Sequence, residues 1–289
     1  MGGVPRILWP RIALWVFSAA VLAFLVLPLA VVVPESFSSG LYLQFPPPGW
    51  SLQWYRAFFS SSEWIGATLL SFEVAACVAL FAIVLGCLAA IALVRTTFRG
   101  KAIVRVLLIT PMIVPTIVVA ISAYSLYSDL HLVATFAGIV LAHTVLALPF
   151  PVMLLAGGLE QVDIRLEEAS GTLGGSRWHT FRRITLPLLW PSLASAALFA
   201  FVTSWDEIIM VIFIGGGGET TLPLKMFSYL RTEINPVIAA VSTLLLALVC
   251  IAFAMGAFAA KRSPWRRASR AALRHRGDSG RSIEFVAVD

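Results

Sequence analysis

Charged residues are scarce in this sequence. Only 12% of its 289 residues are charged and 59% are hydrophobic, whereas soluble domains carry about 25% charged residues. The mean hydropathy is +0.90. A soluble globule of this length needs more polar surface than these residues supply. The composition therefore excludes a soluble domain and indicates a membrane protein.

Lysine is rarer still, because Lys101, Lys225 and Lys261 are the only lysines in the sequence. None of them lies in the pattern GxxxxGK[ST], so the chain has no P-loop to bind the phosphates of ATP. The three cysteines and four histidines are scattered without a CxxC or HExxH pattern, which argues against a metal site. The serine-protease text GDSG occurs at residues 277–280, in a polar tail that offers no scaffold for a base. We expect no catalytic residue, no metal and no cofactor in this chain.

Six apolar blocks are long enough to cross a bilayer, since a helix of about 20 mostly apolar residues spans roughly 30 Å of hydrocarbon. The blocks are Ile12–Val33, Trp64–Val94, Ala102–Tyr127, Leu132–Ala156, Ile184–Ile214 and Pro236–Ala260. Long apolar runs favour helices over the short alternating strands of a barrel. We predict an all-α membrane protein with six transmembrane helices in residues 12–260. An N-terminus of residues 1–11 precedes this domain, and a basic tail of residues 261–289 follows it.

The first block resembles a signal peptide because Arg6 and Arg11 precede it. It is longer than the apolar core of a signal peptide, which has about 7–15 residues, and no clear cleavage site follows it. We therefore expect it to be retained as the first helix.

Positive charge is confined to a few places. All but three of the 21 Lys and Arg residues lie in residues 1–11, 95–105, 165–183 and 261–289. With six spans these places share one side of the membrane, and the positive-inside rule makes that side cytoplasmic. Both termini are then cytoplasmic. Topology explains the net charge of +6 without a nucleic-acid partner. The basic tail either touches anionic lipid or is a disordered end.

One long polar segment, RLEEASGTLGGSRWHTFRRITLPLLWPS, lies at residues 165–192. Apolar residues at three- and four-residue spacing predict a short amphipathic helix from Glu160 to Leu173, broken by the glycines at 171, 174 and 175. Ser176 is placed to cap a second short helix through Trp178 and Phe181. Apolar side chains among charges suit a surface that docks on a partner; an ordinary solvated loop is the alternative.

This segment resembles the EAA loop of bacterial ABC-importer permeases. In that loop Glu-Ala-Ala is followed after three residues by Gly, and after nine more by Ile-x-Leu-Pro. The matching positions are Glu168, Ala169, Ser170, Gly174, Ile184, Leu186 and Pro187, with Ser170 replacing the second Ala as the one departure. The resemblance implies that the segment forms a coupling helix seated in a cleft of an ATPase subunit. Gly174 suits a turn there, because close approach or a positive φ requires a missing Cβ.

The resemblance covers nearly the whole chain. Ser51–Phe59, Leu107–Ser122 and Thr203–Leu245 resemble the spermidine/putrescine branch of the family, and the last stretch indicates its second permease subunit. The resemblance implies a type I ABC-importer permease fold in the bacterial inner membrane and a polyamine as substrate. The implied partners are a dimer of ATPase subunits that binds ATP-Mg, a second homologous permease, an external solute-binding protein and the lipid bilayer.

Acidic residues inside the apolar blocks are candidates for a substrate pathway, because a charge within the bilayer is costly and faces a cavity or a partner. Asp206 and Glu207 lie in the fifth block, and on a continuous helix Asp206 lies about 13 Å from Gly215. Acids suit a cationic polyamine, to which Trp205 can add a cation–π contact. Glu73 lies near the middle of the second block. The alternative role for these acids is to pair with a basic residue or the backbone.

Prolines and glycines mark the expected irregularities. Pro111, Pro115, Pro149 and Pro151 are expected to kink or end helices. The stretch from Gly215 to Pro223 forms either a re-entrant turn or a plain outer loop.

Other functions remain open at the level of sequence. Within the importer class the substrate can instead be an opine, another amine or an organic anion, because a separate binding protein mostly sets specificity. A self-sufficient secondary transporter needs internal inverted repeats, and none is clear. An intramembrane enzyme needs paired catalytic groups at matching depth, which Asp206 and Glu207 alone do not provide.

Overall fold

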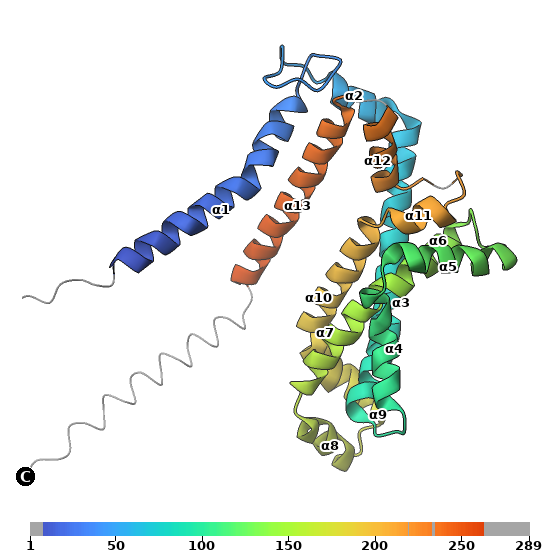
Figure 1. The fold of residues 1–289 in the computed structure, drawn as a ribbon. Helices are drawn as coiled ribbons and strands as arrows, with labels where there is room; N and C mark the ends of the chain where they lie inside the picture. Colours follow the sequence, from blue (N-terminus) through green and yellow to red (C-terminus); the bar gives the residue numbers. More distant parts are fainter. Residues whose placement is uncertain (1–7, 219, 233–234, 263–289) are drawn as a thin grey trace, which may run out of the picture. The chain divides into compact units, whose positions relative to one another are not determined.

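The computed structural model describes residues 8–218, 220–232 and 235–262. By its contacts the chain divides into two units, residues 1–57 with 235–289, and residues 58–234. Most of the predicted N-terminus and nearly all of the predicted basic tail lie outside the described residues. The described part is mainly helical, with one isolated β-bridge and no strand, which confirms the predicted all-α class (Figure 1).

The first unit contains α1 (Leu8–Glu35) and α13 (Val237–Arg262), which contact each other. Most described side chains of α1 are both apolar and exposed, as expected for a helix that lies in lipid or against a partner. The loop after α1 is tied to α2 (Gln53–Ser60) by a 2.7 Å hydrogen bond between Ser36 Oγ and Tyr55 OH.

The second unit is built on the long helix α3 (Ser62–Arg95), which packs against α6 (Phe136–Ala147), α7 (Pro149–Glu160) and α10 (Leu186–Trp205) (Figure 1). The other helices of this unit are α4 (Lys101–Ile113), α5 (Thr116–Asp129), α8 (Ile164–Thr172), α9 (Arg177–Thr180), the π-helix η1 (Phe181–Thr185), α11 (Ile209–Ile214) and α12 (Leu222–Thr232).

Small residues let helices approach α3 closely. Its buried face carries Ala and Ser repeatedly at three- and four-residue spacing, which is typical of tightly packed membrane helices. At Gly86 the approach leaves no room for a side chain, because a Cβ would lie only 2.6 Å from the Cβ of Pro151 on α7. Glycine is therefore required at this position for α3 and α7 to pack as they do.

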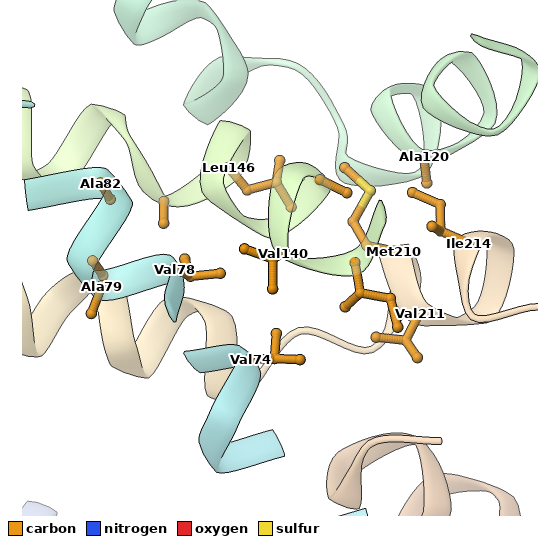
Figure 2. Close-up of a cluster of buried hydrophobic side chains, with 14 residues drawn as sticks. Val74, Val78, Ala79, Ala82, Ala120, Val140, Leu146, Met210, Val211 and Ile214 are labelled. Atoms are coloured by element: carbon orange, nitrogen blue, oxygen red, sulfur yellow. The ribbon is translucent and has the colours of Figure 1, made fainter. Parts of the chain in front are cut away.

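The largest apolar core lies among α3, α5, α6, α10 and α11. Figure 2 shows Val74 and Val78 of α3 pointing toward Val140 of α6 and toward Met210 and Val211 of α11. Through this core the short helix α11 is fixed although it has only six residues.

Each predicted apolar block corresponds to one or two helices. The segments Arg11–Glu35, Ser62–Arg95 and Arg177–Trp205 are long and apolar enough to cross a membrane as single helices. The pairs α4 with α5 and α6 with α7 are bent by 105° and 45°, so each forms either a broken span or a re-entrant loop. In α13 the described stretch Val237–Ile251 is a shorter apolar helix. The number of six complete spans stays a prediction.

The breaks in the third and fourth blocks lie at prolines. Val114 is extended, with φ −74° and ψ 133°, because Pro115 disfavours helical backbone at the residue before it. Pro149 begins α7, where its missing N–H removes one bond of a continuous helix. Pro111 and Pro151 lie within α4 and α7 instead. At the end of the stretch predicted from Gly215 to Pro223, Leu222 and Pro223 form the start of α12.

Candidate functional site

The polar segment between α7 and α10 folds into α8, α9 and η1. Asp163 caps α8, and its side chain accepts a hydrogen bond from Arg165 N at 3.0 Å. The predicted short helix is present as α8, but its predicted start at Glu160 is wrong, because α7 ends at Glu160 and α8 begins after the Asp163 cap. Ser176 caps α9 as predicted and accepts a backbone N–H at 3.2 Å.

Gly174 ends α8 in a left-handed conformation, with φ +83°. Gly175 N donates to Ser170 O at 2.9 Å, and Gly174 N donates to Gly171 O at 3.0 Å. These are the two hydrogen bonds of a Schellman cap, which satisfies the last carbonyls of the helix. Gly171 lies inside α8, so the prediction that it breaks the helix is wrong.

An ion pair between Arg95 and Glu167 anchors α8 to the end of α3. Arg95 Nη2 and Nε donate to Glu167 Oε1 at 3.0 and 3.3 Å, and Nη2 also donates to Val162 O at 2.9 Å. Thr185 Oγ1 donates to the same carboxylate oxygen at 3.1 Å. The charged side chains are only 15% and 21% exposed. These charge-assisted bonds join α3, α8 and η1 into one block, which we call the α3–α8 anchor.

A hollow with a volume of ≈ 660 Å³ opens beside the anchor, lined by the end of α3 and by α8, α9 and η1. Two apolar side chains of the same segment project outward, since Leu173 is 89% exposed and Trp178 is 68% exposed. The ring of Trp178 stacks on Phe181 with centroids 5.8 Å apart. Exposed apolar side chains beside a polar rim are typical of a protein-docking surface.

The seven residues of the EAA pattern lie around this anchor. The exposed members are Glu168, Ala169, Gly174 and Pro187, and the half-buried members are Ser170, Ile184 and Leu186. Ser170 Oγ forms a 2.8 Å hydrogen bond with Thr180 Oγ1. The one departure from the family pattern thus supplies a hydroxyl that ties α8 to α9.

The predicted acidic pair Asp206 and Glu207 lies at a break in the chain, between the end of α10 and the start of α11. The continuous helix that set Asp206 about 13 Å from Gly215 is therefore wrong. Glu207 Oε1 accepts a hydrogen bond from Met210 N at 3.0 Å and caps α11. Glu207 is half-buried, whereas Asp206 is exposed. The structure separates the two acids into a capping residue and an exposed carboxylate.

A row of aromatic rings lies near Glu73 and Trp205, the other two candidates for the substrate pathway. Glu73 is exposed on α3 beside Phe72, whose ring lies edge-on to Phe201 with centroids 5.8 Å apart. Phe201 in turn stacks on Trp205 at 5.7 Å. This row runs from the neighbour of Glu73 to the neighbour of Asp206. Phe201 lies against part of one face of Trp205 and leaves the other face free of this contact.

The anchor residues Arg95, Glu167 and Thr185 are absent from the sequence-based site. Arg95 and Glu167 are 72 residues apart, and helical periodicity carries no signal over that distance. The sequence offers one clue to the role of Glu167. Neighbouring residues on a helix face different directions, so Glu167 and Glu168 cannot both belong to the same surface.

A family model described as "Binding-protein-dependent transport system inner membrane component" matches residues 82–264. The putrescine transport system permease protein PotI of Escherichia coli K12 is 32% identical over 235 residues, covering 79% of this chain and 83% of that protein. The spermidine/putrescine transport system permease protein PotC of Haemophilus influenzae is 33% identical over 232 residues, covering 80% and 90%.

Two solved structures share the fold. One is a bacterial ABC transporter involved in the import of the acidic polysaccharide alginate, with a TM-score of 0.68, 13% identity, and coverage of 84% of this chain and 92% of that chain. The other is a bacterial alginate ABC transporter in complex with a pentasaccharide-bound periplasmic protein, with a TM-score of 0.61, 14% identity, and coverage of 86% and 96%. At these identities the likeness concerns the fold alone. The family match and the two polyamine-permease relatives together show that the chain belongs to the binding-protein-dependent transport system inner membrane components.

Proposed function

We propose that this chain is the transmembrane permease subunit of an ATP-driven importer for a small organic cation, namely a polyamine such as putrescine or spermidine. The chain itself binds no cofactor, and a separate pair of ATPase subunits binds ATP-Mg. A second, similar permease completes the pathway, and an external solute-binding protein delivers the substrate. The protein lies in the bacterial inner membrane with both termini in the cytoplasm.

The anchored segment of α8, α9 and η1 carries the transport part of this proposal. Its outer surface presents Leu173 and Trp178, while Glu167 holds its inner surface to Arg95 of α3. A force applied to α8 by a docked ATPase therefore reaches α3 through charged hydrogen bonds, and reaches α10 through η1. Movement of these long helices opens and closes the pathway.

Charge supports a cationic substrate. Between Arg56 and Arg95 the sequence contains acids but no Lys or Arg, and the same holds between Arg183 and Lys225. Helix α3 lies in the first stretch and carries Glu73 within its apolar part, and Asp206 and Glu207 directly follow α10 in the second stretch. The exposed carboxylates of Glu73 and Asp206 attract a polyamine and repel an anion. The relatives named as putrescine and spermidine/putrescine permeases agree with this choice.

The test is uptake by the complete complex in proteoliposomes. We expect ATP-dependent uptake of radiolabelled putrescine, which stops when the ATPase subunits are inactivated. Excess spermidine should inhibit this uptake, whereas an organic anion should not. Uptake without ATPase subunits would identify a secondary transporter. ATP-dependent uptake that polyamines do not inhibit would overturn the substrate assignment.

A further inference from the structure

A lysine is held in an aromatic cage at the end of α3 opposite the anchor. Lys225 of α12 is only 9% exposed. Its Nζ donates to Glu63 Oε2 at 2.7 Å and lies 5.3 Å from the ring centroid of Trp64 and 5.5 Å from that of Tyr229. The two rings contact each other, with centroids 4.8 Å apart. One carboxylate and two aromatic faces thus surround one ammonium group.

The cage lies at the outer end of the second unit if the anchor lies at the cytoplasmic end. Glu63 lies in the first turn and Arg95 at the last residue of α3, which has 34 residues, so the two are about 50 Å apart at 1.5 Å per residue. Figure 1 shows α12 beside one end of α3, with α8 and α9 near the other end. Because a hydrocarbon core is about 30 Å thick, the cage lies at or beyond the outer interface. Solute arriving from outside meets this region first.

The chemistry of the cage is that of an alkylammonium site. Aromatic faces attract a cation through their ring quadrupole, and aromatic cages of this kind bind ammonium ligands. The carboxylate of Glu63 adds a charge-assisted hydrogen bond. None of these groups distinguishes the ammonium of a lysine from that of a free amine. The cage is therefore already built for the head group of a polyamine.

We propose that Glu63, Trp64 and Tyr229 form a binding site for a free alkylammonium group at the outer mouth of the pathway, and that Lys225 is a tethered occupant which the arriving polyamine displaces. The inference rests on the proposed function, because it takes the displacing cation to be the transported substrate.

Two observations make displacement feasible. Glu63 has a side chain 73% exposed, so an incoming amine reaches the carboxylate before Lys225 leaves it. The start of α12 is held separately, since Leu222 N donates to Ser71 Oγ of α3 at 2.7 Å. The cage therefore keeps its walls when the flexible lysine side chain moves out. The tether acts as an internal competitor at an effective concentration of the order of millimolar, so only amine delivered at high local concentration displaces it.

The first experiment removes the tethered cation. In the assembled complex without binding protein or ATP, we expect Lys225→Ala to bind putrescine at least about tenfold more tightly than the wild type in calorimetric titration, because the internal competitor is gone. Adding Glu63→Gln to Lys225→Ala should abolish this binding. Arg231→Ala is the matched control: it removes a cation from the same helix, one that lies 4.5 Å from the ring of Phe227, and it should leave putrescine binding unchanged.

A second experiment uses the wild type, in case Lys225→Ala fails to assemble. Tetramethylputrescine is a tertiary diamine that keeps an N–H on each protonated nitrogen and is not acylated. We expect it to release Lys225 and to increase acetylation of that residue in mass spectrometry several-fold. Lys101, whose Nζ donates to Thr96 O at 3.2 Å in an exposed position, is the internal control and should react equally with and without the diamine.

Unchanged putrescine affinity in Lys225→Ala, or unchanged acetylation of Lys225 in the wild type, would overturn the inference. These outcomes are separable from failure of the proposed function. If the wild type takes up no putrescine, the assignment of a polyamine as the transported substrate is overturned. The proposal that the transported substrate displaces Lys225 then fails with it. If uptake is normal but putrescine affinity and Lys225 acetylation stay unchanged in these experiments, only the proposed binding site is overturned.

Discussion

Gly174 shows how one backbone angle shapes the segment of α8, α9 and η1 that we propose docks on the ATPase, called the docking segment from here on. Its φ of +83° is unfavourable for a residue with a Cβ, by about 1–2 kcal/mol. We predict that Gly174→Ala loosens the Schellman cap and uncouples ATP hydrolysis from uptake. Gly174→Asn should be milder, because Asn tolerates left-handed backbone better. The measurement is the number of putrescine molecules imported per ATP hydrolysed.

Gly171→Ala is the matched control for that prediction. Gly171 lies within α8, and a Cβ there would meet no described atom within 4 Å. Alanine should therefore stabilise the helix by about 0.5–1 kcal/mol and leave coupling intact. If Gly174→Ala and Gly171→Ala behave alike, the turn at Gly174 has no part in coupling.

Asp206 and Glu207 are adjacent but should respond differently to neutralisation. Asp206→Asn removes an exposed carboxylate and should lower polyamine uptake about tenfold while the complex stays assembled. Glu207→Gln keeps an oxygen that can accept from Met210 N, so α11 should remain capped and uptake should fall less. The check is initial uptake rate together with copurification of the subunits. Unchanged uptake in Asp206→Asn would rule out its charge as a contributor.

At the scale of elements, the α3–α8 anchor is the most testable contact. Arg95→Met leaves Glu167 partly buried without its charged partner, and hydrogen bonds to charged groups contribute about 1.5–3 kcal/mol. We predict that ATP hydrolysis persists while uptake falls, because α8 no longer moves with α3. Uptake and hydrolysis are measured in the same proteoliposomes.

A double-mutant cycle separates the anchor from a general effect of charge. Arg95→Met and Glu167→Gln remove the same interaction, so their effects on uptake should not add. Arg99→Met removes an exposed charge from the loop that follows α3 and should have little effect. Additive effects of the two anchor variants would show that the ion pair does not transmit movement.

The packing of α3 on α7 gives a prediction about stability. A Cβ at Gly86 would lie 2.6 Å from Pro151 Cβ and 3.2 Å from backbone atoms of α7, which cannot shift without moving the helix. We predict that Gly86→Ala destabilises the protein by about 1–3 kcal/mol. Gly66→Ala on the same helix should be neutral or stabilising, because its Cβ would have no neighbour within 4 Å among the described residues. Thermal unfolding of the purified complex compares the two.

The sequence predicts elements well where the signal is local. Ser176 was identified as a cap from its type and position, and the break at Pro115 follows from the ring itself. The break at Asp206 has no such signal, because no Pro or Gly lies between Trp205 and Ile209. That break depends on Glu207 capping the next helix and on the burial of α11 against α5 and α6. Tertiary packing therefore determines where the chain breaks between α10 and α11, and the periodicity of the sequence does not encode this packing.

For the whole molecule, the length of the apolar blocks is enough to predict the helical class. The EAA spacing singles out the segment of α8, α9 and η1, whose docking role stays a prediction. The anchor and the lysine cage were not predictable, since Lys225 and Glu63 are 162 residues apart and Arg95 and Glu167 are 72 apart. Both contacts join α3 to a distant element, one near each end of the helix. α3 thus connects the segment that we propose to face the ATPase with the region where we propose that substrate enters.

Assembly with the ATPase subunits tests this arrangement as a whole. Leu173 and Trp178 are the most exposed large apolar side chains of the docking segment, and truncating an interface hot spot costs about 2 kcal/mol or more. We predict that Leu173→Ser with Trp178→Ser weakens ATPase binding about 30-fold or more, a factor that corresponds to this cost. Phe98→Ser is the control, because Phe98 is 40% exposed in the loop after Arg95 but lies outside the docking segment. Affinity is measured by titrating the purified ATPase onto the immobilised permease pair. If Phe98→Ser weakens binding and the double variant does not, the ATPase docks on the loop after α3, and movement cannot enter the permease through α8.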